Sequence, residues 1–190
     1  DGNDVFLRVT ATDNAGNEHY NTMPLRFDLS RPEIEVTYKN VGETAVHNEN
    51  YYDGNRTATI KFSDRNVDMD QAIFTVSLKD KKYEQDIVLN EESIAILEEL
   101  KDIYGNNIFK NVGIDMDEGT GQDEDIHVST VTLEFNGNEQ YTVDYKCTDL
   151  AGNKNSGKLN TTFTIDKIVP VVTQLYTVDG QEISMESKAY

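Results

Sequence analysis

The chain has 190 residues, long enough for one large domain or for one domain with parts of its neighbours. Its 17 Lys and Arg stand against 35 Asp and Glu, and the formal charge of -18 repels phosphate backbones and anionic lipid head groups, which argues against nucleic acid and membrane insertion. A single cysteine excludes an internal disulfide and a multi-cysteine zinc site, and an apolar set with ten Tyr and no Trp favours strands.

Two short motifs each occur twice in the chain. Thr-Asp-x-Ala-Gly-Asn stands at residues 12–17 and 148–153, and Phe-Asp-Leu-Ser-Arg-Pro at 27–32 parallels Ile-Asp-Lys-Ile-Val-Pro at 165–170. Such self-similarity at a long spacing indicates tandem repeats of one domain. In the first motif the Asp can close an Asx-turn and the Gly tolerates positive φ, which predicts a hairpin turn, with Ca²⁺ ligation by that turn as the alternative.

The two motifs divide the chain into three parts. We expect residues 1–28 to be the C-terminal hairpin of a preceding domain and residues 29–166 to be one complete domain. Residues 167–190 are expected to be the first strand of a following domain or a linker. The segments that precede the two prolines are short, so we interpret them as tight joints between domains.

Six segments of the complete repeat show polar and apolar residues in alternation, which predicts half-buried strands. They are residues 33–38, 57–62, 73–78, 127–135, 141–147 and 159–165. In the fourth segment Val128, Val131 and Leu133 are expected to turn inward around an irregularity. In the fifth, Cys147 is expected to be a small buried hydrophobe, and the hydroxyl of Tyr141 to bond the backbone of the preceding connection.

An insertion over residues 81–125 interrupts this pattern. Asn90 can cap a helix whose first turn is acidic. Apolar residues then follow at helical spacing before Gly105, namely Ile94, Leu97, Leu100 and Ile103. The sequence therefore predicts a helix over residues 91–104. The predicted fold class is an all-β sandwich with an inserted acidic loop that contains this one α-helix.

The framework resembles a known family. Residues 51–66 read Tyr-Tyr-Asp-Gly-Asn-Arg-Thr-Ala-Thr-Ile-Lys-Phe-Ser-Asp-Arg-Asn, and residues 148–153 close the repeat with Thr-Asp-Leu-Ala-Gly-Asn. Together they resemble the bacterial immunoglobulin-like repeats of large Gram-positive cell-surface proteins, of the kind found in gut Firmicutes. The resemblance covers residues 32–80 and 129–166 but not the helical insertion, and it implies an immunoglobulin-like β-sandwich.

The function implied by this resemblance is that of a non-catalytic surface module. We expect an adhesin-like module that binds a host protein or glycoprotein, immunoglobulins included. The alternative is a passive stalk or spacer, with or without Ca²⁺ to rigidify it, that presents other modules. The resemblance also implies an extracellular location at the cell surface or cell wall, neighbouring immunoglobulin-like domains of the same chain as partners, and any export signal or anchor outside these residues.

Two sets of residues are candidates for binding. Tyr51 and Tyr52 offer rigid contact area with a polar tip, and the alternative is that they pack against a loop or a neighbouring domain. In the insertion, Glu98, Glu99 and Asp102 are expected to face outward as an acidic ridge. The alternative is that the helix only covers a sheet edge or fills a gap.

The acidic run of the insertion supplies the metal candidates. Asp115, Asp117, Asp123 and Asp125 offer oxygen ligands, with glycines among them for tight turning, as a Ca²⁺ loop requires. The run lacks the closing glutamate of an EF-hand loop. A solvated acidic loop is therefore the favoured interpretation, with a Ca²⁺ site as the alternative, and no cofactor other than Ca²⁺ is expected.

Catalytic motifs are missing from the sequence. The three histidines have no ligand-like spacing, and the chain has no phosphate-binding glycine loop, zinc signature or nucleophile elbow. We therefore do not expect an enzyme.

Overall fold

The structure, a computed structural model, describes residues 2–41, 50–117, 125–155, 159–172, 174–178 and 181–185, with side chains over 5–41, 50–117, 125–155 and 159–172. It contains one α-helix, α1 (Glu91–Glu99), and one 3₁₀ turn (Met69–Gln71) among these residues. The strands are β1 (Gly2–Thr12), β2 (Glu18–Phe27), β3 (Glu33–Asn40), β4 (Tyr51–Tyr52), β5 (Arg56–Asp64), β6 (Ile73–Leu78), β7 (Tyr83–Val88), β8 (Phe109–Asp115), β9 (His127–Phe135), β10 (Glu139–Lys146), β11 (Thr161–Ile165), β12 (Gln174–Val178) and β13 (Gln181–Met185).

Two sheets form the central sandwich. One has the order β3-β5-β9-β8 and the other the order β4-β11-β10-β6-β7, with every pairing antiparallel except that of β4 with β11. These orders match the two sheets of an immunoglobulin-type sandwich. The predicted all-β sandwich with one helix is confirmed.

The sandwich core is strongly aromatic. Apolar residues at alternate positions of β5, β6, β9 and β10 point inward with at most 1% of their surface exposed, as strand geometry dictates. The ring of Phe135 lies 5.0 Å from those of Tyr141 and Phe163 and 5.3 Å from that of Phe109, measured between centroids. Burying each such ring stabilises the fold by about 2–3 kcal/mol.

The predictions for Tyr141, in β10, and for Cys147, directly after it, are confirmed. The hydroxyl of Tyr141 donates to the backbone oxygen of Gly137 at 3.0 Å, in the connection that precedes β10. A Cβ added at Gly137 would lie 3.2 Å from that hydroxyl, so the close approach favours glycine. Cys147 is 1% exposed, and burial, with the charge of Asp68 as the next cause, raises the pKa of its thiol to about 12.

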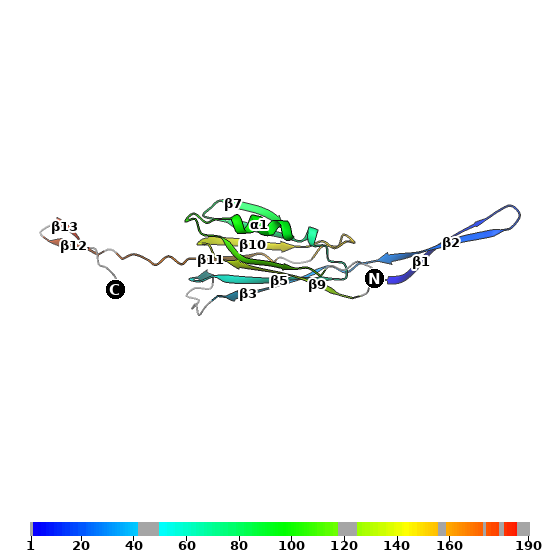
Figure 1. The fold of residues 1–190 in the computed structure, drawn as a ribbon, viewed down its shortest axis with the longest axis horizontal. Coiled ribbons are helices and arrows are strands. Elements are labelled where there is room, and N and C mark those ends of the chain that lie inside the picture. Colours follow the sequence, from blue (N-terminus) through cyan, green and yellow to red (C-terminus); the bar gives the residue numbers. More distant parts are fainter. Residues whose placement is uncertain are drawn as a thin grey trace.

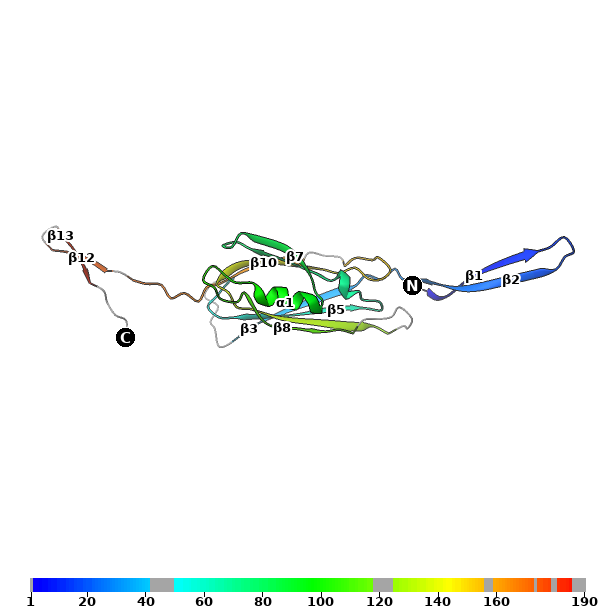
Figure 2. The same ribbon diagram turned by 45° about the horizontal axis from the view of Figure 1, so that its top comes forward.

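The insertion is part of both sheets, which corrects the prediction of an inserted loop. Strand β7 pairs with β6 in one sheet, and β8 pairs with β9 in the other. The helix α1 connects these two edge strands and lies over the side of the sandwich between them (Figure 2). Residues 81–125 therefore complete the two sheets instead of lying outside them.

The helix begins where the sequence predicts and ends earlier. Asn90 caps it, because its side-chain oxygen accepts hydrogen bonds from the Ser93 backbone N–H at 3.2 Å and hydroxyl at 3.0 Å. The predicted end at residue 104 is wrong, since Leu100 is already extended. The Asp102 carboxylate accepts the backbone N–H groups of Tyr104 and Asn106, and this turn competes with helix.

A two-stranded hairpin lies beyond each end of the sandwich (Figures 1 and 2). The N-terminal one is β1–β2, and in the C-terminal part β12 pairs with β13, where a single strand or a linker is predicted. The first hairpin repeats the register of β10–β11: Val5 faces Leu25 as Tyr141 faces Phe163. Among the described residues, no helix has the length and apolarity needed to cross a bilayer.

Candidate cation site at the joint before the sandwich

The joint between β2 and β3 is organised by an aspartate. The carboxylate of Asp28 accepts hydrogen bonds from the backbone N–H of Ser30 at 2.9 Å and from its hydroxyl at 2.5 Å. This side-chain turn redirects the chain after β2, and Pro32 is then buried at the start of β3. The local sequence Asp-Leu-Ser thus fixes where the Asp28 side chain lies.

Two further aspartates come from the sandwich itself. Asp64 is the last residue of β5 and is 4% exposed, and Asp149 follows β10 and is 3% exposed. Asp149 is held by Asn153, whose backbone N–H and side-chain amide donate to its carboxylate at 2.7 and 2.9 Å. The turn requires Gly152 at a φ of 89°, which explains the glycine of the repeated motif. In the other copy of the motif, the carboxylate of Asp13 accepts the backbone N–H of Ala15 at 2.9 Å, which confirms the predicted Asx-turn there.

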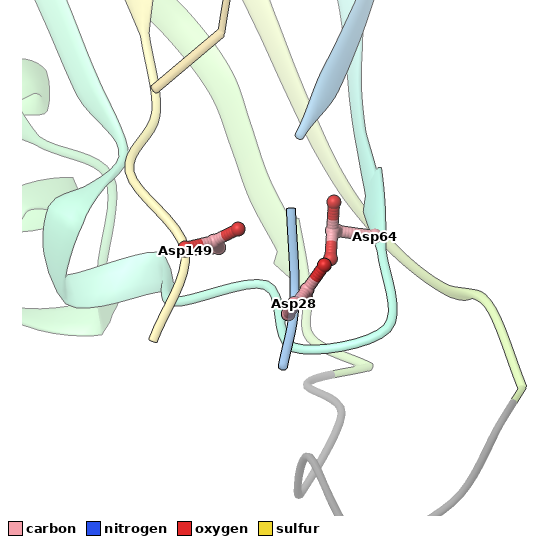
Figure 3. A group of neighbouring side chains, drawn as sticks. All are labelled: Asp28, Asp64 and Asp149. Carbon is pink, nitrogen blue, oxygen red and sulfur yellow. The ribbon is translucent and has the colours of Figure 1, made fainter. Parts of the chain in front are cut away.

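The three carboxylates converge on one point (Figure 3). Asp28, Asp64 and Asp149 each offer an oxygen atom, and these atoms lie within 4.8 Å of one another. Burial raises the pKa of Asp64, a hydrogen bond from the N–H of Asn66 opposes this, and the charges of Asp28 and Asp149 raise the pKa further. Ionisation of Asp64 beside these two carboxylates is therefore unfavourable unless a cation neutralises its charge.

Asn66 adds an unpaired oxygen beside this cluster. It is 6% exposed, its N–H donates to Asp64 at 3.2 Å, and its carbonyl oxygen accepts the N–H of Leu150, the neighbour of Asp149, at 3.1 Å. Its buried side-chain oxygen has no hydrogen-bond partner within the described part of the chain. A buried amide oxygen without a partner is costly, and a bound cation would satisfy it.

This donor set suits Ca²⁺. The ion takes six to eight oxygen ligands and prefers carboxylate and amide oxygens. The three carboxylates, from two segments of the sandwich and one of the joint, supply part of such a shell, and the unpaired side-chain oxygen of Asn66 is a candidate for a further ligand. Backbone carbonyls and water commonly complete it.

The metal candidates predicted from the acidic run lie elsewhere. Asp115, Asp117 and Asp125 are exposed, and Asp123 falls outside the described residues. The carboxylate of Asp117 lies 3.0 Å from Nδ1 of His127, and this hydrogen bond lowers the pKa of Asp117. Among the described residues, the carboxylates that cluster are those of Asp28, Asp64 and Asp149, and none of the predicted metal candidates is among them.

The predicted acidic ridge is not formed as expected. Glu98 and Glu99 are exposed, but Asp102 is only 5% exposed, so its predicted outward orientation is wrong. Burial opposes ionisation of Asp102, yet hydrogen bonds from Asn106, Asn138 and Tyr104 outweigh it and lower its pKa. Asp102 therefore holds a turn together.

The two tyrosines lie at β4, on an edge of the second sheet. Tyr51 is 50% exposed and stays a candidate for contact with a partner. Tyr52 is half-buried, with its ring edge-on to Phe163 at 6.1 Å and the guanidinium of Arg56 4.3 Å from its centroid. Tyr52 thus packs against strands of its own sandwich.

Comparison of the chain with protein-family models, with curated proteins and with solved structures gave no match. The resemblance to immunoglobulin-like surface repeats therefore stays a prediction from the sequence.

Proposed function

We propose that the chain is a spacer segment of a tandem array of β-sandwich domains on a bacterial surface, with joints stiffened by Ca²⁺. The observation that carries this proposal is the meeting of Asp28, from the joint, with Asp64 and Asp149 of the sandwich. A cation held by all three would tie the linker to the domain. The orientation of whatever precedes the joint would then be fixed relative to the sandwich.

The arrangement of the elements supports an in-line spacer. The joint at Asp28 leads into β3 at one end of the sandwich, and the chain leaves after β11 at the opposite end (Figure 1). Tension applied to the two ends would therefore run along the sandwich. Elements placed in line in this way lengthen an array with each repeat.

The repeated motifs support the same joint at a second position. Asp166 occupies the place of Asp28 in its motif, and Asp13 occupies the place of Asp149. The turn at Asp13 has the same hydrogen bonds as that at Asp149, including an N–H of Asn17 that donates to the carboxylate at 2.9 Å. Asp166 would thus contribute to a second cation site, completed by the domain that follows it in an array.

Calcium binding is tested with the purified chain by calorimetric titration and thermal unfolding. A ligand that binds only the folded joint stabilises it, by about 2.7 kcal/mol at a hundredfold excess over Kd. We expect Ca²⁺ to raise the melting temperature by several degrees and a chelator to reverse this. Asp149→Asn and Asp28→Asn should weaken the response strongly.

The repeat offers a matched control. Asp13→Asn changes the same motif position in the exposed hairpin, where the described residues form no carboxylate cluster, and should leave the Ca²⁺ response unchanged. A melting curve that ignores both Ca²⁺ and chelator would remove the proposal. An equal loss of response in Asp13→Asn and Asp149→Asn would show that binding is diffuse and not at the joint.

Binding of a host protein or glycoprotein stays a prediction from the resemblance. The exposed members of the candidate sets are Tyr51, Glu98 and Glu99. Deleting the insertion would remove two sheet strands, so point variants are the better test. Capture of mucosal immunoglobulins or mucins that is lost in Glu98→Lys with Glu99→Lys, and kept in Glu84→Lys, would favour adhesion over a passive spacer.

A further inference from the structure

A lysine, an asparagine and a glutamate meet at the other end of the sandwich, where the chain leaves β11. Lys167 is fixed there by its backbone N–H, which donates to the side chain of Asn138 at 2.8 Å. Its Nζ donates to the side-chain oxygen of Asn55 at 2.6 Å and to the backbone oxygen of Asn136 at 2.5 Å. The amine therefore touches the amide group of a residue that precedes β5.

A buried carboxylate faces the other side of that amide. The side-chain nitrogen of Asn55 donates to Oε1 of Glu134, which is 8% exposed on β9. The second oxygen, Oε2, accepts the side-chain N–H of Asn111 at 2.6 Å. Asn111 has a φ of 50° at the register shift of β8, and this irregular conformation directs it toward Glu134. Asn111 is thus a positioning residue for the carboxylate.

We propose that Lys167 and Asn55 form an intramolecular isopeptide bond, with Glu134 as the proton-transferring group. Nζ of the neutral lysine bonds to Cγ of Asn55, the Cγ–Nδ2 bond breaks, and the amide nitrogen leaves as ammonia. Glu134 accepts a proton from the attacking nitrogen and returns it to Nδ2, so the carboxylate ends unchanged. One amide replaces another, and no oxidant, reductant or energy source is needed.

The geometry suits this transamidation. Because a carbonyl bond is about 1.2 Å long, Nζ lies within about 4 Å of Cγ of Asn55, close to the separation of reacting groups in productive complexes. Desolvation, followed by the charge of Lys110, lowers the pKa of the Lys167 amine, and this favours the neutral, nucleophilic form. The carboxylate already touches the nitrogen that has to leave.

A neighbouring asparagine shows why Asn55 is the reacting partner. Nζ of Lys167 also lies 3.3 Å from the side-chain oxygen of Asn136. The amide nitrogen of Asn136, however, donates to the backbone oxygen of Asn107 at 2.6 Å. A backbone carbonyl has no proton to deliver to a leaving amide, whereas Glu134 can carry one. Asn136 is therefore an internal control.

The bond would have a mechanical consequence that goes beyond a Ca²⁺-stiffened joint. It would connect the first residue after Asp166 directly to the start of β5, so force entering at this end would bypass β11. In the first joint, Leu29 stands in the place of Lys167 and carries no amine. The bond is thus specific to the C-terminal end of this repeat and is independent of the cluster at Asp28.

Intact mass spectrometry of the purified, denatured 190-residue chain tests the proposal. We expect a mass below the value calculated from the sequence by one ammonia molecule. Proteolysis should release a branched peptide in which Lys167 is joined to Asn55. Lys167→Arg, Asn55→Ala and the isosteric Glu134→Gln should each restore the calculated mass, while Asn136→Ala should keep the ammonia loss.

Loss of ammonia alone is not sufficient, because the Asn136-Gly137 pair can also lose it by forming a succinimide. That product would persist in Lys167→Arg and vanish in Asn136→Ala, which is the reverse of the pattern expected for the bond. A wild-type chain of unreduced mass overturns the proposal, as does a branched peptide through another asparagine. Both readouts of the wild-type chain stand even where a variant fails to fold.

Discussion

Asn153 donates its side-chain amide to the backbone oxygen of Asp28 at 3.1 Å, across 125 positions of sequence. The same amide group donates to the carboxylate of Asp149 at 2.9 Å. One side chain therefore holds the turn after β10 and the joint before β3 together. Asn153 thus has two structural roles, as a turn residue and as a bridge to the joint.

Replacing Asn153 by Ala should destabilise the sandwich and loosen the joint. The change removes the hydrogen bonds to Asp149 and Asp28, each with a net contribution of about 0.5–1.5 kcal/mol, and we expect a loss of about 1–3 kcal/mol. Urea denaturation measures it. Asn17→Ala is the matched control, because the side-chain amide of Asn17 donates to Asp13 of its own turn in the exposed hairpin, and its effect on the sandwich should be near zero.

Replacing Asp64 by Asn should stabilise the chain when no divalent cation is present. Because the pKa of Asp64 is raised in the folded state, that state binds the proton more tightly than the unfolded state. The contribution of Asp64 to stability is therefore present at low pH and is lost as pH rises through the folded pKa. At pH 7 in chelator the neutral Asn avoids this penalty, and we expect a gain on the order of 1 kcal/mol.

In the presence of Ca²⁺, Asp64→Asn should be destabilising instead of stabilising. Asp64→Asn removes a charged ligand, so its melting temperature should rise less on addition of Ca²⁺ than that of the wild type. Asp70→Asn, an exposed change nearby in sequence, is the control and should alter neither curve. A destabilised Asp64→Asn in chelator would show that the carboxylate is held by favourable contacts and not strained by repulsion.

The strands that the sequence predicts are those with two distinct faces. In β5 and β10 fully buried residues alternate with half-buried or exposed ones, so the period of two is visible in the residues themselves. In β7 only Ile87 is buried, and in β8 a register shift breaks the alternation. Both are edge strands whose place depends on the neighbour with which they pair, and no local pattern carries that information.

The candidate sites were harder to predict for a similar reason. The acidic run with Asp115 and Asp117 attracts attention because its members are adjacent in sequence. The observed cluster draws Asp28, Asp64 and Asp149 from three distant segments, and only the fold brings them together. The repeated motifs did mark two of these residues, whereas Asp64 ends an ordinary strand.

Cys147 should be inert in the folded chain and should report unfolding. With its pKa raised to about 12 by burial, almost no thiolate is present at pH 8, and only the thiolate is a nucleophile. Labelling by a disulfide reagent should be slow in buffer, should rise as the pH approaches the raised pKa, and should reach the ordinary rate in urea. Fast labelling at pH 8 without denaturant would contradict the burial of the thiol.

If the isopeptide bond forms, replacing Lys167 or Asn55 should have a large effect on stability, and the two effects should not add. It would close a loop between Asn55 and Lys167, and a loop of roughly 100 residues is worth about 4–5 kcal/mol in chain entropy. We therefore expect Lys167→Arg and Asn55→Ala each to lower the free energy of unfolding by several kcal/mol, as measured in urea. The double variant should be scarcely worse than either single one, because both remove the same bond. Losses of about 1 kcal/mol that add in the double variant would instead fit a hydrogen bond without the covalent link.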